Sequence, residues 1–97
     1  MIRHVVLFRW KPTATEEQRA QAASEVAKLP SVVSSVRGFE SGADIGVNEG
    51  NFDFSVTADF DDEAGYIAYR DDPAHRQMVA DFLAPIWAER AAVQFTY

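Results

Sequence analysis

Two histidines are the side chains of this sequence best suited to acid–base chemistry near neutral pH. His75 follows the pair Asp72-Pro73, which is typical of a helix start, and it therefore falls at about the third position of a predicted helix. The partial positive charge of a helix N-terminus favours a neutral imidazole, which is the form that accepts a proton as a general base. Asp71 and Asp72 oppose this effect, although we expect Asp72 to be engaged in capping the helix.

The second histidine, His4, lies in the first predicted strand, on the face that also carries Val6 and Phe8. A histidine on an apolar face is often a structural core residue, and this alternative stays open for both histidines. The two histidines lack a carboxylate at a spacing typical of a metal site, so we expect no metal. The absence of cysteine excludes thiolate nucleophiles, thiolate ligands and disulfides. No nucleophile-elbow serine and no phosphate-binding glycine loop is present, and we expect no cofactor.

The first predicted strand, Ile2–Lys11, alternates regularly and carries apolar residues on both of its faces. Val6 and Phe8 point one way, while Val5 and Leu7 point the other way. Each set needs a covering layer, because leaving such side chains in water forfeits about 1.5–3 kcal/mol apiece. We therefore predict that helices cover one face of the sheet and that a second copy of the chain covers the other, forming a homodimer.

A helix is predicted after Pro12. Thr13 and Thr15 each fit a capping box, and the helix is expected to run to about Leu29, where Pro30 ends it. The side chains expected to face the sheet are mostly small: the aliphatic part of Arg19, Ala22, Ala23, Val26 and Leu29. Small residues at these positions either let the helix approach the sheet closely or leave room for a ligand.

The remaining elements complete the order β-α-β-β-α-β. They are a weak strand Ser34–Gly42, a strand Phe52–Phe60, a divided helix running from Asp61 to about Arg70 and from Asp72 to Pro85, and a strand Ala91–Tyr97. This order predicts an α+β, ferredoxin-like domain of residues 1–97, with a four-stranded antiparallel sheet and helices on one face. Polar residues on the other face of the third strand favour the alternative of a semi-polar face and a monomer: Asp53, Ser55, Thr57 and Asp59.

Composition excludes several classes of function. The formal charge is −6, with 9 basic and 15 acidic residues and no basic stripe, so a nucleic acid would be repelled. The longest apolar run, Val5–Phe8, is far too short to cross a bilayer, and no signal-peptide pattern precedes the first strand. We expect a cytoplasmic protein with no membrane or nucleic-acid partner.

Four segments together resemble the stress-responsive dimeric α/β barrel (Dabb) family. They are Ile2–Pro12, which resembles the family's first strand, Phe39–Gly42, Asp72–His75 and Val93–Tyr97. The resemblance covers nearly the whole chain in the expected order, and it implies ferredoxin-like protomers whose sheets pair into a dimeric α/β barrel. Asp72 departs from the family's His-Pro-x-His turn, where the first histidine usually stands.

The resemblance also implies a chemistry. Olivetolic acid cyclase, a plant member of the family, performs a cofactor-free aldol cyclisation of a polyketide thioester with a histidine as base. The matching positions are His75 as the base, Tyr69 as the hydrogen-bond donor to the enolate, and His4 as a nearby group that orients or polarises the substrate. The expected substrate pocket is lined by Val6, Phe8, Ala22, Val26, Val56, Val79, Phe82 and Trp87.

Three functions stay open on this basis. The first is a homodimer that binds a small hydrophobic molecule and acts as a cofactor-independent cyclase or lyase on a carbonyl compound. The second is a non-catalytic, dimeric stress-associated protein whose pocket is filled by Phe8, Phe82 and Trp87. The third is a cofactor-free monooxygenase or isomerase on a related scaffold.

Overall fold

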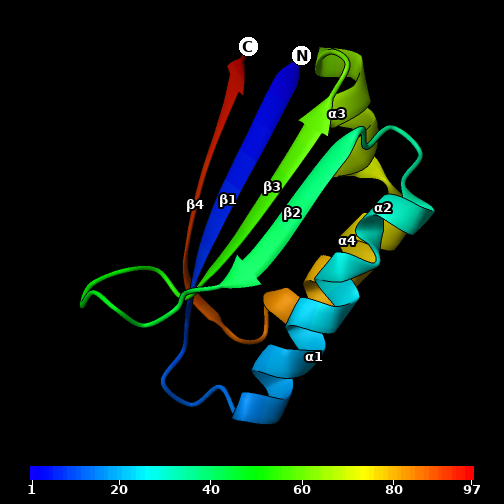
Figure 1. Cartoon of the computed structure of the whole chain (residues 1–97). Coiled ribbons are helices and arrows are strands. Elements are labelled where there is room, and N and C mark those ends of the chain that lie inside the picture. The colour runs from blue at the N-terminus through cyan, green and yellow to red at the C-terminus, as the bar shows by residue number, and fades with distance from the viewer.

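A four-stranded antiparallel sheet carries helices on one of its faces in the computed structural model of the chain, which describes residues 1–97 (Figure 1). The strands lie in the order β2-β3-β1-β4, and every neighbouring pair is antiparallel. Their bounds are β1 Ile2–Trp10, β2 Gly38–Ala43, β3 Phe54–Phe60 and β4 Trp87–Thr96. The predicted α+β, ferredoxin-like fold is confirmed.

The helices lie between the strands as two groups. The first group is α1 (Glu16–Ala27) and α2 (Leu29–Val32); the second is α3 (Glu63–Asp71), α4 (Pro73–Met78) and a π-helical turn, η1 (Val79–Leu83). Thr15 forms the capping box of α1 with Gln18. The prediction that Pro30 ends a helix is wrong in detail, because Pro30 stands near the start of α2, where a missing N–H has no consequence.

Two element starts differ from the predicted ones for local reasons. The cap of α3 is Asp62, which accepts a hydrogen bond from the Gly65 amide at 2.9 Å, whereas Asp61 pairs with Arg37. Strand β3 begins at Phe54 because Asp53 accepts a hydrogen bond from the Trp10 amide, which holds the end of the 44–53 loop against β1.

Two strands also begin at residues other than the predicted ones. Strand β2 starts at Gly38 rather than Ser34, since the Val36 amide donates to Val33 in a turn. Strand β4 starts at Trp87 rather than Ala91, and a register shift opposite Arg9 and Trp10 interrupts the alternation that would have revealed it.

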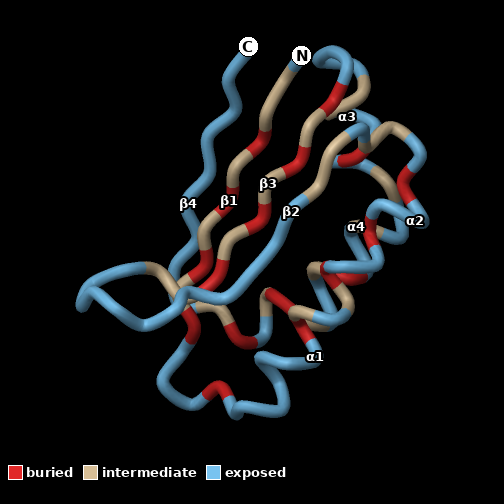
Figure 2. The backbone as a smooth tube through the Cα atoms, in the orientation of Figure 1, coloured by how far each residue is buried: buried red, intermediate tan, exposed pale blue.

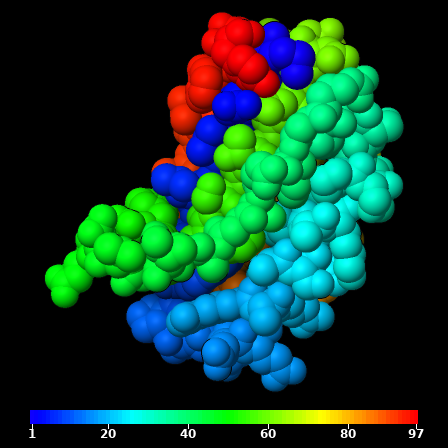
Figure 3. Space-filling model, in the orientation of Figure 1, coloured from blue at the N-terminus to red at the C-terminus, as the bar shows by residue number.

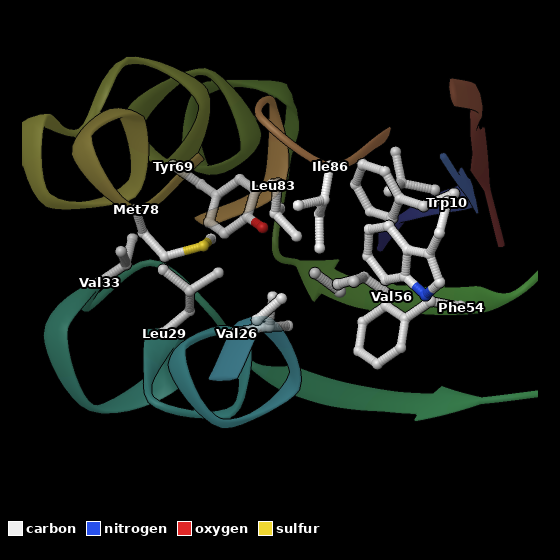
Figure 4. Close-up of a cluster of buried hydrophobic side chains, with 14 of the residues drawn as sticks. Trp10, Val26, Leu29, Val33, Phe54, Val56, Tyr69, Met78, Leu83 and Ile86 are labelled. Atoms are coloured by element: carbon white, nitrogen blue, oxygen red, sulfur yellow. The ribbon is translucent and has the colours of Figure 1, made fainter. Parts of the chain in front are cut away.

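The core lies between the helices and the inner face of the sheet, meaning the face that the helices cover. Alternate residues of β1 and β3 are buried there (Figure 2). Figure 4 shows side chains of α1, α2, α4 and η1 meeting this face, with the Tyr69 hydroxyl directed into the cluster. Ala22 is fully buried, whereas Arg19, predicted to lay its stem inward, is exposed.

The outer face of the sheet carries no helix. Val5 and Leu7 are half-buried within it, and their cross-strand partners on β4 are Val93 and Ala91. Val93 and Phe95 are 56% and 46% exposed, although both are large apolar residues. The 44–53 loop projects away from the body of the chain (Figure 3).

No helix of the structure combines the length and apolarity needed to span a bilayer.

Candidate functional site

A cavity of about 560 Å³ lies between the inner face of the sheet and the helices. Eighteen residues line it, and 13 of them are hydrophobic. Pockets that bind small molecules typically measure roughly 300–1,000 Å³ and combine apolar walls with a few polar groups. The cavity therefore has the size and the lining of a small-molecule site.

Most residues of the expected pocket line this cavity. They are His4, Val6, Phe8, Val26, Val56, Tyr69, His75, Val79 and Trp87. Ala22 and Phe82 do not line it. Ala22 is fully buried, so its small side chain brings α1 close to its neighbours rather than enlarging the cavity.

Phe82 lies outside the cavity because of η1. The Ala84 amide donates to the Val79 carbonyl, five residues earlier, at 2.8 Å. A π-helical turn holds more residues than an α-helical turn, so the side chains that follow Val79 are rotated relative to α-helical spacing. Leu83 is consequently buried in the wall, whereas Phe82 is half-buried and packs against the edge of the core.

The junction between α3 and α4 brings Tyr69 and His75 together. The Asp72 side chain accepts hydrogen bonds from the backbone amides of Ala74 and His75, at 2.8 and 3.2 Å, and so caps α4 as predicted. This turn places the Tyr69 and His75 rings with centroids 4.2 Å apart and planes at 33°. The His75 Nδ1 atom is buried and has no hydrogen-bond partner.

His4 approaches the same group from the sheet. It is 5% exposed, and its Nδ1 lies 2.7 Å from Oε1 of Gln94 on β4. An amide oxygen accepts, so Nδ1 carries the ring proton and Nε2 is left as an acceptor. The His4 ring centroid lies 6.2 Å from that of Tyr69 and 5.0 Å from that of Tyr66.

Burial sets the protonation states of these side chains. Desolvation lowers the pKa of His4 and of His75 below the usual value of 6.5, and the Arg90 guanidinium lowers both pKa values further. The hydrogen bond with Gln94 acts in the opposite direction on the pKa of His4, and the backbone of Arg70 and the Asp72 carboxylate do so on the pKa of His75. Burial also raises the pKa of Tyr69 well above its usual value. Near neutral pH the site thus holds two neutral imidazoles and a protonated phenol.

Five polar residues of this site escaped the sequence-based prediction. Tyr66, Arg70, Arg76 and Arg90 line the cavity, and Gln94 binds His4. Tyr66 precedes Tyr69 by three residues on α3, and this helical spacing was a usable signal. Arg90 and Gln94 depend on the pairing of β1 with β4, which residue spacing does not give.

Metal ligands are not grouped in the structure. No cluster of three or more histidine, cysteine, aspartate or glutamate side chains is placed to hold an ion.

The family profile of the stress responsive A/B barrel domain (Dabb) matches residues 2–97. The chain belongs to this family. A dimeric ferredoxin-like protein of unknown function from Thermobifida fusca is 45% identical to this Dabb chain, with a TM-score of 0.91 over 99% of this chain and 90% of that one. No curated protein matches the chain.

Two more distant structures share the Dabb fold. A Dabb family protein from Mesorhizobium loti is 25% identical, with a TM-score of 0.83 over 99% of this chain and 95% of that one. A hydroxynitrile lyase from Passiflora edulis is 17% identical, with a TM-score of 0.84 over 97% of this chain and 90% of that one. At these identities the likeness to the plant enzyme concerns the fold.

Proposed function

We propose that this Dabb domain is a homodimer that binds a small apolar carbonyl compound and acts on it as a cofactor-independent cyclase or lyase. The observation that supports this most directly is the cavity that joins Tyr69, His75 and His4 in one wall. A cavity of about 560 Å³ at this position argues against a non-catalytic protein whose pocket is filled.

His75 is the proposed general base. Its lowered pKa keeps the imidazole neutral near pH 7, and its buried Nδ1 has no partner within the chain. His75 lines the cavity, so a neutral imidazole stands beside any ligand bound there. A neutral base in the cavity wall is what the removal of a proton from a bound substrate requires.

The proposed reaction begins at a carbon beside a carbonyl group. His75 takes the proton from that carbon, and the bonding electron pair moves onto the carbonyl oxygen to form an enolate. Tyr69 stays protonated because its pKa is raised, and its hydroxyl donates to the enolate oxygen. In a cyclisation the enolate carbon attacks a second carbonyl of the same molecule, and the new alkoxide takes the proton back from His75.

His4 is proposed to orient the substrate. Its bond to Gln94 fixes the ring, and the free Nε2 accepts hydrogen bonds only. An acceptor in the cavity wall suits a hydroxyl or enol group of the substrate. His4 therefore complements Tyr69, which donates.

The homodimer is proposed to form through the outer face of the sheet. This face carries Val5, Leu7, Val93 and Phe95, which are apolar and half-buried or exposed. Arg3 and Asp59 on the same face pair through two hydrogen bonds of 2.8 and 3.1 Å, so covering them brings no unpaired charge out of water. The similar protein from Thermobifida fusca is described as dimeric.

The lyase from Passiflora edulis supports the class of reaction. That protein is described as a hydroxynitrile lyase and shares the fold of this chain. A protein with this fold can therefore act as a lyase, as the Passiflora edulis relative does. The assignment for this chain depends on its own cavity.

Exchange of α-protons tests the proposal without knowledge of the product. We expect the protein to accelerate hydrogen–deuterium exchange beside the carbonyl of 4-phenyl-2-butanone or 2-octanone in D₂O, followed by proton NMR. His75→Gln should lower the catalysed rate by about a hundredfold or more, since a general base contributes roughly 10²–10⁴-fold. Tyr69→Phe should lower it by ~10²-fold, because it removes the donor to the enolate.

Arg19→Gln is the matched control, because Arg19 is exposed on α1 and lies outside the cavity. Its exchange rate should equal that of the unaltered protein. Equal rates for the unaltered protein and His75→Gln would overturn the role of His75, and no acceleration of either ketone by the unaltered protein would overturn the catalytic proposal.

A further inference from the structure

Cationic groups gather around the cavity although the whole chain is acidic. Three arginines are among its 18 lining residues: Arg70, Arg76 and Arg90. No aspartate or glutamate lines the cavity, although the chain has 15 of them against 9 lysines and arginines. The local charge is thus opposite to the formal net charge of −6.

Two of these arginines have no carboxylate partner. The chain contains five ion pairs, and neither Arg76 nor Arg90 takes part in any of them. Arg70 differs, because its guanidinium binds both carboxylate oxygens of Asp71, at 2.9 and 3.1 Å. Arg76 and Arg90 therefore present free guanidinium groups at the cavity.

The free guanidinium groups lie near the proposed reacting side chains. Arg90 stands opposite Phe8 in the β1–β4 pairing, on the inner face of the sheet. Its charge lowers the pKa of His4, His75 and Tyr69, and the charge of Arg76 also lowers that of His75. An anion bound by these arginines would therefore lie within reach of the catalytic groups.

We propose that the ligand of this cavity is an apolar carboxylate, whose anionic end is bound by Arg90 and Arg76 and whose apolar part fills the remaining cavity. The inference rests on the proposed small-molecule function and specifies its substrate class. Guanidinium groups match the planar geometry of a carboxylate. No serine, threonine or lysine lines the cavity, which favours a carboxylate over a phosphate.

Calorimetric titration with matched probes tests this inference. Octanoate and octanamide share their chain and differ in charge, and octyl phosphate carries the alternative anion. We expect octanoate to bind about tenfold or more tightly than octanamide, because only the carboxylate carries a negative charge and two equivalent oxygens that can pair with guanidinium groups. Arg90→Gln and Arg76→Gln should each weaken octanoate binding several-fold and should weaken octanamide binding less.

Arg19→Gln removes a third guanidinium that has no ion pair but lies on exposed α1, outside the cavity. It should leave the affinity for octanoate unchanged, which controls for the loss of overall charge. The altered arginines are exposed, so thermal unfolding should match that of the unaltered protein.

The outcomes separate this inference from the proposed function. Equal affinities for octanoate and octanamide, or no effect of both cavity variants, would overturn the carboxylate while the apolar cavity remained a ligand site. Tighter binding of octyl phosphate would overturn the choice of carboxylate. Binding of none of the probes would overturn both the inference and the proposed binding function.

Discussion

At the scale of single residues, burial decides what each polar group of the cavity can do. His4 and His75 are kept neutral by desolvation, and Tyr69 is kept protonated. A neutral imidazole beside a protonated phenol is the pair that proton abstraction and enolate stabilisation require. The same desolvation makes the two histidines sensitive to acid.

Stability should therefore fall as the pH drops below about 6.5. The folded-state pKa values of His4 and His75 lie below the usual 6.5, so the unfolded chain takes up protons first and is stabilised by them. The contribution is fully present above pH 6.5 and is lost as the pH falls toward the folded-state pKa values. Urea unfolding at pH 7.5 and pH 5.5 should show a lower midpoint at pH 5.5.

The double variant His4→Gln/His75→Gln is the comparison for this effect. Its urea midpoint should change less between the two pH values, because the titrating groups are gone. The pKa values of Asp59 and Asp71 are also lowered, but these carboxylates affect stability only below their usual pKa of 3.8, which is outside the range from pH 5.5 to pH 7.5. An equal midpoint change in both proteins would contradict the role given to the histidines.

At the scale of elements, the turn between α3 and α4 builds the site. Asp72 ends α3 and caps α4, and its side chain holds the His75 amide. The π-helical turn that follows α4 then decides which apolar residues reach the cavity. The position of the proposed base thus depends on one helix cap.

Asp72→Ala should destabilise the protein by about 1 kcal/mol and also disturb the cavity. It removes two hydrogen bonds to the start of α4, one of them to His75. Asp72→Asn keeps an acceptor and removes the charge, so it separates the cap from the electrostatic effect on His75. Urea unfolding measures the stability, and NMR signals of the His75 ring report its position.

Asp62→Ala provides a matched control, because Asp62 caps α3 through the Gly65 amide and lies away from the cavity. It should cost a similar free energy of unfolding and leave the His75 ring signals in place. Identical ring signals in Asp72→Ala and the unaltered protein would show that the cap does not position His75.

At the scale of the whole molecule, the sheet is covered by helices on one side alone (Figure 1). The outer face buries Val5 and Leu7 only in part and leaves about half of the surface of Val93 and Phe95 exposed, at 56% and 46%. Burying one such side chain stabilises an interface by about 1.5–3 kcal/mol, and in a two-fold dimer both protomers contribute the same side chains. A second copy of the chain is the partner that this face suits.

Val93→Glu and Phe95→Glu should therefore convert the dimer to a monomer at micromolar concentration. Each substitution places two unpaired carboxylates in the interface, which is costly away from water. Sedimentation velocity or light scattering after gel filtration measures the mass. A monomeric unaltered protein would overturn the proposed dimer.

Val32→Glu is the control for this experiment. Val32 is 55% exposed on α2, on the helical side of the molecule, so its apolar exposure is close to that of Val93. It should remain dimeric. Loss of the dimer in Val32→Glu as well would assign the interface to another surface.

Local chemistry determined much of this protein in advance. The alternation of β1 and β3, the caps at Thr15 and Asp72 and the family resemblance all follow from residues close together in sequence. These features predicted the element order, the ferredoxin-like fold and a site near His75. Propensity, capping and period-two burial act over a few residues, and a sequence displays them directly.

Long-range pairing decided the rest. His4 meets Gln94 across 90 positions, and Arg90 reaches the cavity through the register of β4 on β1. The π-helical turn removed Phe82 from the expected wall, and Asp62 rather than Asp61 became a cap. The size of the cavity, the arginines that line it and the desolvation of its histidines all depend on segments that are far apart in sequence. They could not be predicted from the sequence, because a side chain becomes buried only when these segments pack together.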